Sequence, residues 1–365
     1  MLETLILKDF RNYTDTKVHP KLGINLFVGA NGVGKSNLLE SIFTVSIGKS
    51  PWASDRKEMI RFENPYALIR SKWSNRDECA MQINRKGRNE ILLNNKRVSR
   101  LSSLVGNFPT VIAGPQEIEL VKGSPRVRRR LLDLHISQLS REYLTSSSNY
   151  QKLIKGRNAL LKKIAKYGSK DYSYLISWDK RLVEDAELLV QTRIKFLENL
   201  SVKAGEAYSA ISNQNSEFRL EYKSTYKLDS DFFEQLERSR EKDIEIGETR
   251  LGPHRDDFDI FLDGRNLREF GSWGECRTAS LALVLGTAKA INQKFDRPPL
   301  LLLDDCFASL DIERAQALLS YLNQFGQSFL TTPIDYNAFI YNSKEMKNLH
   351  IYHFLSPGEF IISDE

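Results

Sequence analysis

The pattern of apolar and polar residues divides the chain into three stretches. Up to about residue 120, apolar and polar residues alternate, or form short apolar runs between turn residues. These patterns are typical of β-strands buried on one face or on both. A segment that is apolar on one side predicts a helix at residues 36–47. The strands that we expect here cover residues 2–9, 24–28, 66–73, 78–85 and 111–113.

Beyond Pro125 the apolar period changes to three and four residues, which is typical of helices. Two such series follow one another, and Tyr167-Gly168-Ser169 separates them. The pattern predicts an antiparallel helical hairpin with arms of about 25 to 40 residues, or about 40 to 60 Å at the α-helical rise. A strand at 218–226 and a short helix at 229–240 are expected after it.

The third stretch mixes both periods. Residues 258–263 alternate and end in an Asp263-Gly264 turn, so we expect a β-hairpin that continues through 267–270. Residues 278–291 form a strong amphipathic helix pattern. Four leucines at 300–303 predict a strand buried on both faces of a parallel sheet, and residues 330–332 fit a neighbouring strand.

Composition and charge leave several classes of partner open. The chain has 365 residues, 53 basic and 47 acidic, for a formal net charge of +6. This mild excess permits a polyanionic partner without requiring one. The three cysteines form neither a disulfide framework nor a zinc motif, which favours a reducing cytoplasm. The chain starts directly in a strand, so we expect no signal peptide, and no apolar run is long enough to cross a membrane.

One stretch carries a specific chemical signal, because it fits the phosphate-binding pattern G-x-x-x-x-G-K-[ST] between an expected strand and an expected helix. Its backbone N–H groups and the helix N-terminus make an anion site. Lys35 would reach the β and γ phosphates, and the Ser36 hydroxyl would ligate Mg²⁺. The alternative is a glycine-rich turn with a chance lysine. The stretch comprises Gly29, Ala30, Asn31, Gly32, Val33, Gly34, Lys35 and Ser36.

Two carboxylates follow the strand of four leucines, where ligands of α/β sheets bind. In a nucleotide site Asp304 would hold Mg²⁺ through water, and Asp305 would orient or deprotonate the attacking water. Gln116 follows the strand at 111–113 and could reach a metal or that water, although taken alone a solvated glutamine is the favoured explanation.

Three further polar segments have two explanations each. Arg11 and Asn12 precede the strand that leads to the glycine loop. They either lie near the sugar and base of a bound nucleotide or form a solvated turn. Ser272 and Gly274 begin the helix at 278–291, where a serine caps the helix or faces an anion. His254 could be catalytic, but without a nucleophile or metal partner we favour a structural or substrate-positioning role.

Basic residues gather after Pro125 and along the first helical arm. Such a helix face is often only solvated, but the excess of one sign also fits binding to a phosphate backbone. The candidate residues are Arg126, Arg128, Arg129, Arg130, Lys152, Lys155, Lys162 and Lys163, with Arg157 and Lys166 on the same arm.

Taken together and in order, these motifs resemble the RecF family, within the ABC-type ATPases that include SMC-like chromosome proteins. The resemblance runs over nearly the whole chain. It rests on Phe10-Arg11-Asn12-Tyr13, the glycine loop with Asn37-Leu38-Leu39-Glu40, Leu120-Val121-Lys122-Gly123 with Arg128-Arg129-Arg130, Gly252-Pro253-His254-Arg255-Asp256-Asp257, the signature at Ser272, and Asp304-Asp305 with Leu310-Asp311.

The resemblance implies an α/β fold: an ABC-type P-loop ATPase head with an inserted helical lobe like a coiled-coil hairpin. The head would comprise residues 1–120 and 251–365, and the insert residues 121–250. The cofactors implied are ATP and Mg²⁺. Ser272 and Gly274 would meet the γ-phosphate bound by a second copy, so that two ATP molecules are sandwiched in a homodimer. Asp311 would lie at the dimer interface, and Thr331 or Thr332 would sense the γ-phosphate.

The function implied is ATP-dependent DNA binding in recombinational repair and replication, with weak ATPase activity. Such proteins recognise duplex or gapped DNA and, with RecO and RecR partners, help to load RecA on single strands. The basic residues named above would then contact phosphates in a salt-sensitive, largely sequence-independent manner.

The chain departs from the family pattern in four places. Ser36 replaces the usual threonine and keeps its hydroxyl, whereas Glu275 adds a carboxylate where glutamine is usual. Ala308 stands where serine is usual in the Ser-Glu-Leu-Asp segment. A threonine stands where ABC proteins often place a histidine after the last sheet strand. Slow hydrolysis fits these departures.

Three other classes of ATPase compete with this one. A transporter subunit does not need the roughly 235 residues between Lys35 and Ser272. An SMC-like structural protein needs longer arms, and a nuclease-linked ATPase needs a further domain for which no residues remain.

Overall fold

A computed structural model describes residues 1–168, 172–295, 298–307, 310–333 and 348–363. The chain folds into two compact units. Unit 1 contains residues 1–118, 203–216 and 273–365, and unit 2 contains residues 119–202 and 217–272. The first boundary lies close to the predicted one at 120. Residues 251–272 were predicted to belong to the ATPase head, but they lie in unit 2. There β10 (Asp257–Leu262) pairs with β9 (Phe218–Lys223).

The six-stranded sheet of unit 1 that carries the candidate site has the order β15-β14-β3-β13-β12-β8. Within the described residues, five neighbouring strands of this sheet are parallel: β14 (Leu349–Ser356), β3 (Gly23–Val28), β13 (Gln327–Thr332), β12 (Leu300–Leu303) and β8 (Thr110–Ala113). The strand β15 (Glu359–Ser363) pairs antiparallel with β14. Parallel strands end at the same edge of a sheet. The glycine loop, Asp304-Asp305, Thr331-Thr332 and Pro115-Gln116 therefore leave the sheet at one edge.

The second sheet of unit 1 is antiparallel, with the order β2-β1-β4-β5-β6-β7. Its strands are β1 (Leu2–Phe10), β2 (Tyr13–Val18), β4 (Tyr66–Trp73), β5 (Glu78–Asn84), β6 (Glu90–Leu93) and β7 (Lys96–Arg97). The helix α1 (Lys35–Ile47) contacts strands of both sheets and is buried on nearly all sides. Its polar residues Glu40, Ser41, Thr44 and Ser46 are buried as well, so more of the helix is covered than the apolar side that its sequence pattern shows.

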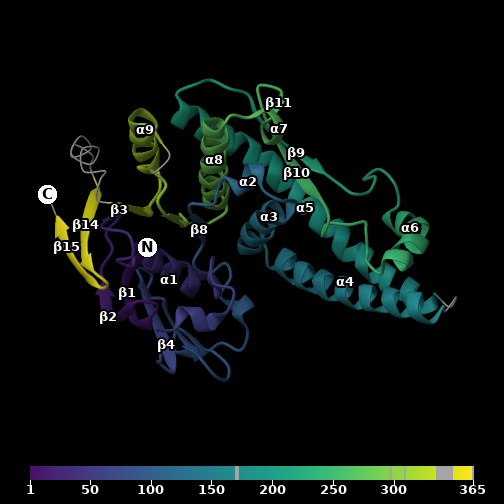
Figure 1. Ribbon diagram of the computed structural model, residues 1–365, viewed down its shortest axis with the longest axis horizontal. Helices are drawn as coiled ribbons and strands as arrows, with labels where there is room; N and C mark the ends of the chain where they lie inside the picture. The colour runs from purple at the N-terminus through teal and green to yellow at the C-terminus, as the bar shows by residue number, and fades with distance from the viewer. Residues whose placement is uncertain (169–171, 296–297, 308–309, 334–347, 364–365) are drawn as a thin grey trace. The chain divides into compact units, whose positions relative to one another are not determined.

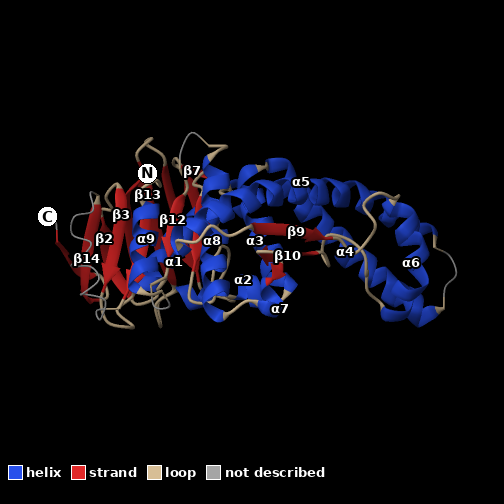
Figure 2. Cartoon of the chain, turned by 90° about the horizontal axis from the view of Figure 1, so that it is seen from above, coloured by secondary structure: helices blue, strands red, loops and turns tan. Residues whose placement is uncertain are grey.

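The helices α8 (Trp273–Asn292) and α9 (Ile312–Leu322), the end of α5 (Ser173–Ser212) and the strands β14 and β15 also belong to unit 1 (Figure 2). The buried helix α8 contacts β8, and Gly286 packs against the backbone of Ala204, near the end of α5. The helix α9 follows β12, and β14 with β15 closes the sheet.

Unit 2 is built on the predicted helical hairpin (Figure 1). Its arms are α4 (Arg141–Tyr167) and α5, of 27 and 40 residues, and α4 ends at Gly168, whose φ of 64° suits a glycine. The helices α2 (Glu119–Lys122), α3 (Pro125–Leu139) and α6 (Phe232–Ile246) accompany them. A three-stranded sheet has the order β11-β10-β9, in which β11 comprises Arg265–Asn266. No helix among the described residues is long and apolar enough to span a membrane.

The structure corrects one predicted element in unit 2. Residues 267–270 do not continue a β-hairpin but form the short helix α7 (Leu267–Phe270), because β11 (Arg265–Asn266) ends after two residues. The side chain of Asn266 accepts a hydrogen bond from the Arg268 N–H and caps α7. The helix predicted at 229–240 begins at Phe232 and runs on to Ile246.

Candidate nucleotide-binding site

The glycine loop has the conformation that its sequence requires. Gly32 and Gly34 have φ angles of 86° and 104°, which residues with a side chain rarely adopt. The ammonium group of Lys35 folds over the loop and donates to the carbonyl oxygens of Gly29, at 2.6 Å, and Ala30, at 2.9 Å. The lysine is therefore held inside the loop, where a phosphate oxygen can replace these two acceptors.

A hydrogen-bonded chain joins the helix start to the ends of two strands. The hydroxyl groups of Ser36 and Thr331 both donate to Oδ1 of Asp304, at 2.8 Å and 2.6 Å. The Thr331 hydroxyl in turn accepts from the backbone N–H of Asp305 at 2.8 Å. Thr331 therefore fixes both acids relative to the loop.

Asp305 has two features of a strained functional residue. Its φ is 51°, which is unusual for a residue other than glycine. Its Oδ1 atom is buried and has no hydrogen-bond partner among the described residues. Burial is the largest cause of the raised pKa of both Asp304 and Asp305, and the neighbouring Asp304 charge raises the pKa of Asp305 further. The two carboxyl groups thus repel each other where a cation would relieve both.

A cavity of about 280 Å³ lies over these groups. Hydroxyl and carboxylate oxygens are donors that Mg²⁺ prefers, so Ser36 and Asp304 fit the ion implied by the sequence. The lysine ammonium and the glycine loop fit phosphate. The residues around the cavity are Asn31, Gly32, Gly34, Lys35, Ser36, Asn37, Pro115, Asp304, Asp305, Thr331 and Pro333.

The other residues predicted to act on the nucleotide do not line this cavity or lie outside the described residues. Gln116 is exposed and is not among the residues that line the cavity, although its neighbour Pro115 is. Thr332 is buried and does not line the cavity. Ala308 and Ser309 lie outside the described residues. The proposed roles of Gln116 and Thr332 stay predictions.

Arg11 and Asn12 lie beside the helix start and the loop. The Arg11 guanidinium binds both carboxylate oxygens of the buried Glu40, at 2.7 and 2.8 Å. Asn12 donates to the carbonyl oxygen of Gly32 at 3.3 Å and accepts from Asn37 at 2.9 Å. Arg11 thus anchors this segment to α1, and Asn12 touches the loop.

Two neighbours of the site were missed at the sequence level. The buried Tyr13 donates its hydroxyl hydrogen to the Gly34 carbonyl oxygen at 2.8 Å and so braces the loop. Glu117 follows Gln116, and burial raises the pKa of its carboxyl to about 7. The position of Tyr13, directly after Arg11-Asn12, was the signal for its contact. The sequence carried no comparable signal for Glu117.

The signature residues lie at the start of α8. Ser272 is exposed and directly precedes the helix, and the adjoining Trp273 is 59% exposed. A Cβ added to Gly274 would lie 3.4 Å from the Arg314 guanidinium, so the start of α8 lies close to the start of α9. Asp311 caps α9 by accepting from the Arg314 N–H at 2.8 Å.

The prediction that Arg128 contacts DNA is wrong. Its side chain is fully buried, pairs with Asp257 at 2.7 Å, and donates to backbone carbonyl groups at the end of α2. A buried, fully engaged guanidinium holds the fold instead. Arg129 is partly buried and donates to the Asp256 carbonyl oxygen, whereas Arg126 and Arg130 are exposed. All four predicted lysines of α4 are exposed: Lys152, Lys155, Lys162 and Lys163.

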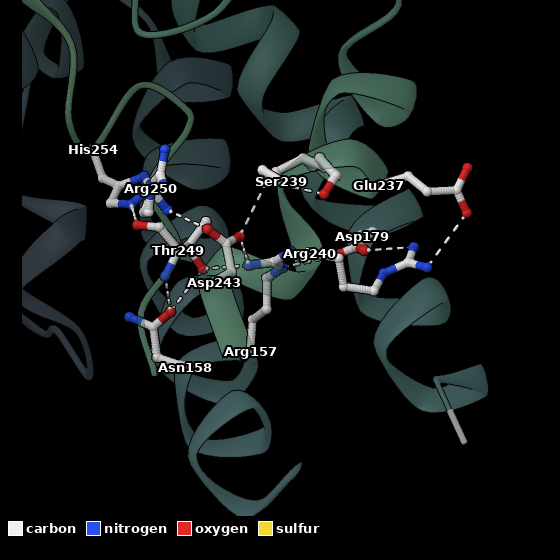
Figure 3. A network of polar contacts seen from close by, with 11 residues as sticks. Arg157, Asn158, Asp179, Glu237, Ser239, Arg240, Asp243, Thr249, Arg250 and His254 are labelled. Carbon is white, nitrogen blue, oxygen red and sulfur yellow. Dashed lines mark hydrogen bonds and ion pairs between the residues drawn. The ribbon is translucent and has the colours of Figure 1, made fainter. Parts of the chain in front are cut away.

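Arg157, expected on the basic face of the first arm, is also buried (Figure 3). It donates to Asp179 at 2.6 Å and to Asp243 at 2.8 Å, and it also bonds the Thr249 hydroxyl. This network ties α4 to α5 and α6 and, through Thr249, to the segment before Gly252.

His254 belongs to the same polar network (Figure 3). Its Nε2 atom lies 3.0 Å from the Thr249 carbonyl oxygen, and its Nδ1 atom lies 2.8 Å from the Tyr150 hydroxyl. Burial lowers the pKa of the imidazole to about 4. A neutral, buried histidine with both nitrogens engaged supports the structural role that we favoured.

The comparisons with known proteins agree with this geometry. Residues 1–347 match the family model of the RecF/RecN/SMC N-terminal domain. The chain is 34% identical to the DNA replication and repair protein RecF of Ligilactobacillus salivarius, over 91% of this chain and 90% of that one. It is 33% identical to the protein of the same name from Staphylococcus carnosus, over 99% of both chains.

Solved structures show the same relationship. The structure of the recombination mediator protein RecF with ATP, in the RecFOR pathway, superposes with a TM-score of 0.87 at 28% identity, over 100% of this chain and 97% of that chain. An SMC head bound to the winged-helix domain of ScpA shares the fold, with a TM-score of 0.58 at 20% identity over 99% of this chain and 96% of that chain. The chain belongs to the RecF family and has the α/β fold of an ABC-type P-loop ATPase head with an inserted helical lobe.

Proposed function

We propose that this protein is an ATP-dependent DNA-binding protein of recombinational repair and replication, with weak ATPase activity. The observation that carries the proposal is the meeting of Lys35, Ser36, Asp304, Asp305 and Thr331 at one sheet edge. Relatives named DNA replication and repair protein RecF, and a similar structure described with ATP, support it.

The chain's own residues divide the work at the nucleotide. Lys35 and the loop N–H groups would bind the β and γ phosphates. Ser36 would ligate Mg²⁺ and Asp304 would hold it through water, with Gln116 as a further candidate ligand. When bound, Mg²⁺ neutralises charge on the phosphate oxygens. The Asp305 carboxylate orients the attacking water and accepts its proton. The hydrogen bonds of Tyr13 and Thr331 hold the glycine loop and the two acids in their positions. Thr331 and Thr332 are candidates for sensing the γ-phosphate.

Closure of the site by a second copy is the next part of the proposal. Ser272 and Gly274 stand at the N-terminus of a 20-residue helix, which favours negative charge. The extra phosphate of ATP over ADP would strengthen this contact, so ATP favours the homodimer and hydrolysis releases it. Asp311 caps α9 close to Gly274 and would lie at the same interface.

DNA is the proposed macromolecular partner. Exposed Arg126 and Arg130, with Lys152, Lys155, Lys162 and Lys163 on α4, would contact phosphates without reading sequence. Arg129 would contribute from a partly buried position. The similar solved structure with ATP is that of a recombination mediator in the RecFOR pathway, so we propose RecR- and RecO-type mediators as partners and RecA loading as the outcome.

The test measures ATP affinity and duplex binding in parallel. We expect Lys35→Ala to weaken ATP binding by about ten-fold or more, because it removes a charge-assisted hydrogen bond to phosphate. ATP should also strengthen duplex binding in a gel-shift assay for the wild type but not for this variant. Lys21→Ala, at an exposed lysine before β3, is the matched control.

Asp305→Asn separates binding from hydrolysis. It should keep ATP affinity and slow phosphate release, because the amide cannot accept the proton from water. Wild-type ATP affinity in Lys35→Ala would remove the central claim. Duplex binding that is indifferent to ATP would favour an ABC ATPase of another class.

A further inference from the structure

The exposed face of α4 carries a row of five lysines. Residues 151–167 contain no aspartate or glutamate. The opposite face is buried through Leu153, Ile154, Leu161 and Ile164. At 3.6 residues per turn the row spans an arc of about 100° and a length of about 21 Å. We call it the lysine stripe; its members are the exposed Lys152, Lys155, Lys162, Lys163 and Lys166.

The lysine stripe ends at two exposed aromatic rings. Tyr167 is the last residue of α4 and Tyr174 the second residue of α5, and each is 73% exposed. The Lys166 ammonium lies 5.4 Å from the centroid of the Tyr167 ring. Between residues 141 and 190, within the described part of the chain, these are the large apolar side chains that are exposed.

Packing beneath the rings holds the two helix ends together. Leu161 and Ile164 of α4 form a buried cluster with Leu175 of α5. Tyr172 packs against this cluster and lies below the Arg240 guanidinium, so it points inward. Figure 1 shows the end of α4 and the start of α5 together at one end of the hairpin. Tyr167 and Tyr174 are therefore both exposed at this end of the hairpin, which we call the tip.

We propose that this tip is a stacking platform for the unpaired bases of single-stranded DNA, with Tyr167 and Tyr174 as the rings and the lysine stripe as the phosphate track. The inference rests on the proposed DNA-binding function. It adds that the single-stranded part of a duplex–single-strand junction binds at this tip. A base needs one exposed ring, and its strand needs nearby positive charge. A protein partner would instead need a contiguous apolar patch, whereas the Tyr167 ring lies beside the Lys166 ammonium at the end of the lysine stripe.

The experiment uses the full chain with ATP and Mg²⁺ and three DNAs that share one duplex. The first is blunt, the second carries a short thymidine tail, and the third carries an abasic tail of equal length. The abasic tail keeps the phosphates and removes the bases. We expect the wild type to prefer the thymidine tail over both other DNAs in fluorescence anisotropy.

Tyr167→Leu/Tyr174→Leu should bind the thymidine-tailed DNA about ten-fold more weakly, and the other two DNAs as the wild type does. Leucine favours helix formation, so the variant should fold, which its melting temperature checks. Tyr167→Phe/Tyr174→Phe keeps the rings and should restore the preference. Phe62→Leu, at an 84% exposed ring in unit 1, is the matched control and should change nothing.

Two results would overturn the inference. One is a leucine variant that keeps the wild-type preference for the thymidine tail. The other is an equal loss on all three DNAs, which would make the tip a simple phosphate contact. Failure of the wild type to bind even the blunt duplex with ATP would instead contradict the proposed function itself.

Discussion

At the scale of single residues, unit 2 depends on ionisable groups that are buried in one fixed protonation state. His254 is held between Thr249 and Tyr150, and its pKa is lowered to about 4. His135 on α3 is fully buried, and burial lowers its pKa to about 3. Because each folded-state pKa lies below the ordinary value of 6.5, the folded state excludes a proton that the unfolded chain accepts.

This difference predicts that the protein loses stability in acid. Above pH 6.5 both histidines are neutral in both states. As the pH falls from 6.5 toward 4, each of these two histidines gains a proton only in the unfolded chain, so each lowers the free energy of unfolding by up to about 1.4 kcal/mol per pH unit. Urea unfolding at a series of pH values measures this slope.

His254→Gln provides the comparison for that slope. Glutamine keeps a donor and an acceptor but does not titrate, so the slope below pH 6.5 should be shallower than in the wild type. An unchanged slope would mean that His254 is already protonated in the folded protein.

Residue roles at the site could be predicted from the sequence where a motif fixes local geometry. The glycine loop, Ser36 and the Asp304-Asp305 pair follow from their place after parallel strands, and the structure brings them together. Arg128 and Arg157 could not be assigned this way. A buried arginine and an exposed one look alike in sequence, because its acidic partners lie far along the chain, at Asp257 and Asp243.

At the scale of elements, the contact between α4 and α5 is set by one close approach. A Cβ added to Gly156 would lie 2.3 Å from the edge of the Trp178 ring. We expect Gly156→Ala to destabilise the protein by about 1 to 3 kcal/mol, because overpacking exceeds the gain of about 1 kcal/mol in helix propensity. Thermal unfolding measures this loss.

A second substitution distinguishes packing from propensity at this contact. Trp178→Leu removes the ring edge, so adding Gly156→Ala to it should cost less than in the wild type, or even stabilise. Lys155→Ala, on the exposed face of the same turn, is the control and should have little effect. If Gly156→Ala alone raises the melting temperature, the two helices are not packed as closely as the structure shows.

Helices and strands could be predicted from the sequence where their apolar residues follow a clear period over enough residues. Both long arms and the parallel strands β3, β8, β12 and β13 have clear patterns, and Gly168 marks the end of α4. The segment 267–270 is shorter than two helical turns and carries no helical period, so the sequence predicts it as a continuation of the hairpin that the alternating residues 258–263 begin. The membership of residues 251–272 in unit 2 depends on pairing with β9, which no local pattern encodes.

At the scale of the whole molecule, the proposed sandwich makes each ATP site depend on two chains. Ser272→Arg places a bulky cation where the second chain's phosphates would meet the start of α8. ATP affinity should stay near that of the wild type, because Lys35 and its loop are intact. The ATP-dependent doubling of mass in light scattering should disappear, whereas Ser99→Arg, at an exposed serine near β7, should leave it unchanged.

Mixing two defective chains gives the sharpest form of this prediction. In a mixed dimer of Ser272→Arg with Lys35→Ala, the intact loop of the first chain faces the intact signature of the second, so one complete site forms. The opposite site combines both defects and stays empty. We therefore expect ATP to bring the two variants together, although neither dimerises alone, and sizing the mixture with ATP and with ADP measures it. If Ser272→Arg dimerises normally, or the mixture stays monomeric while wild type dimerises, the two sites are not shared in the proposed way.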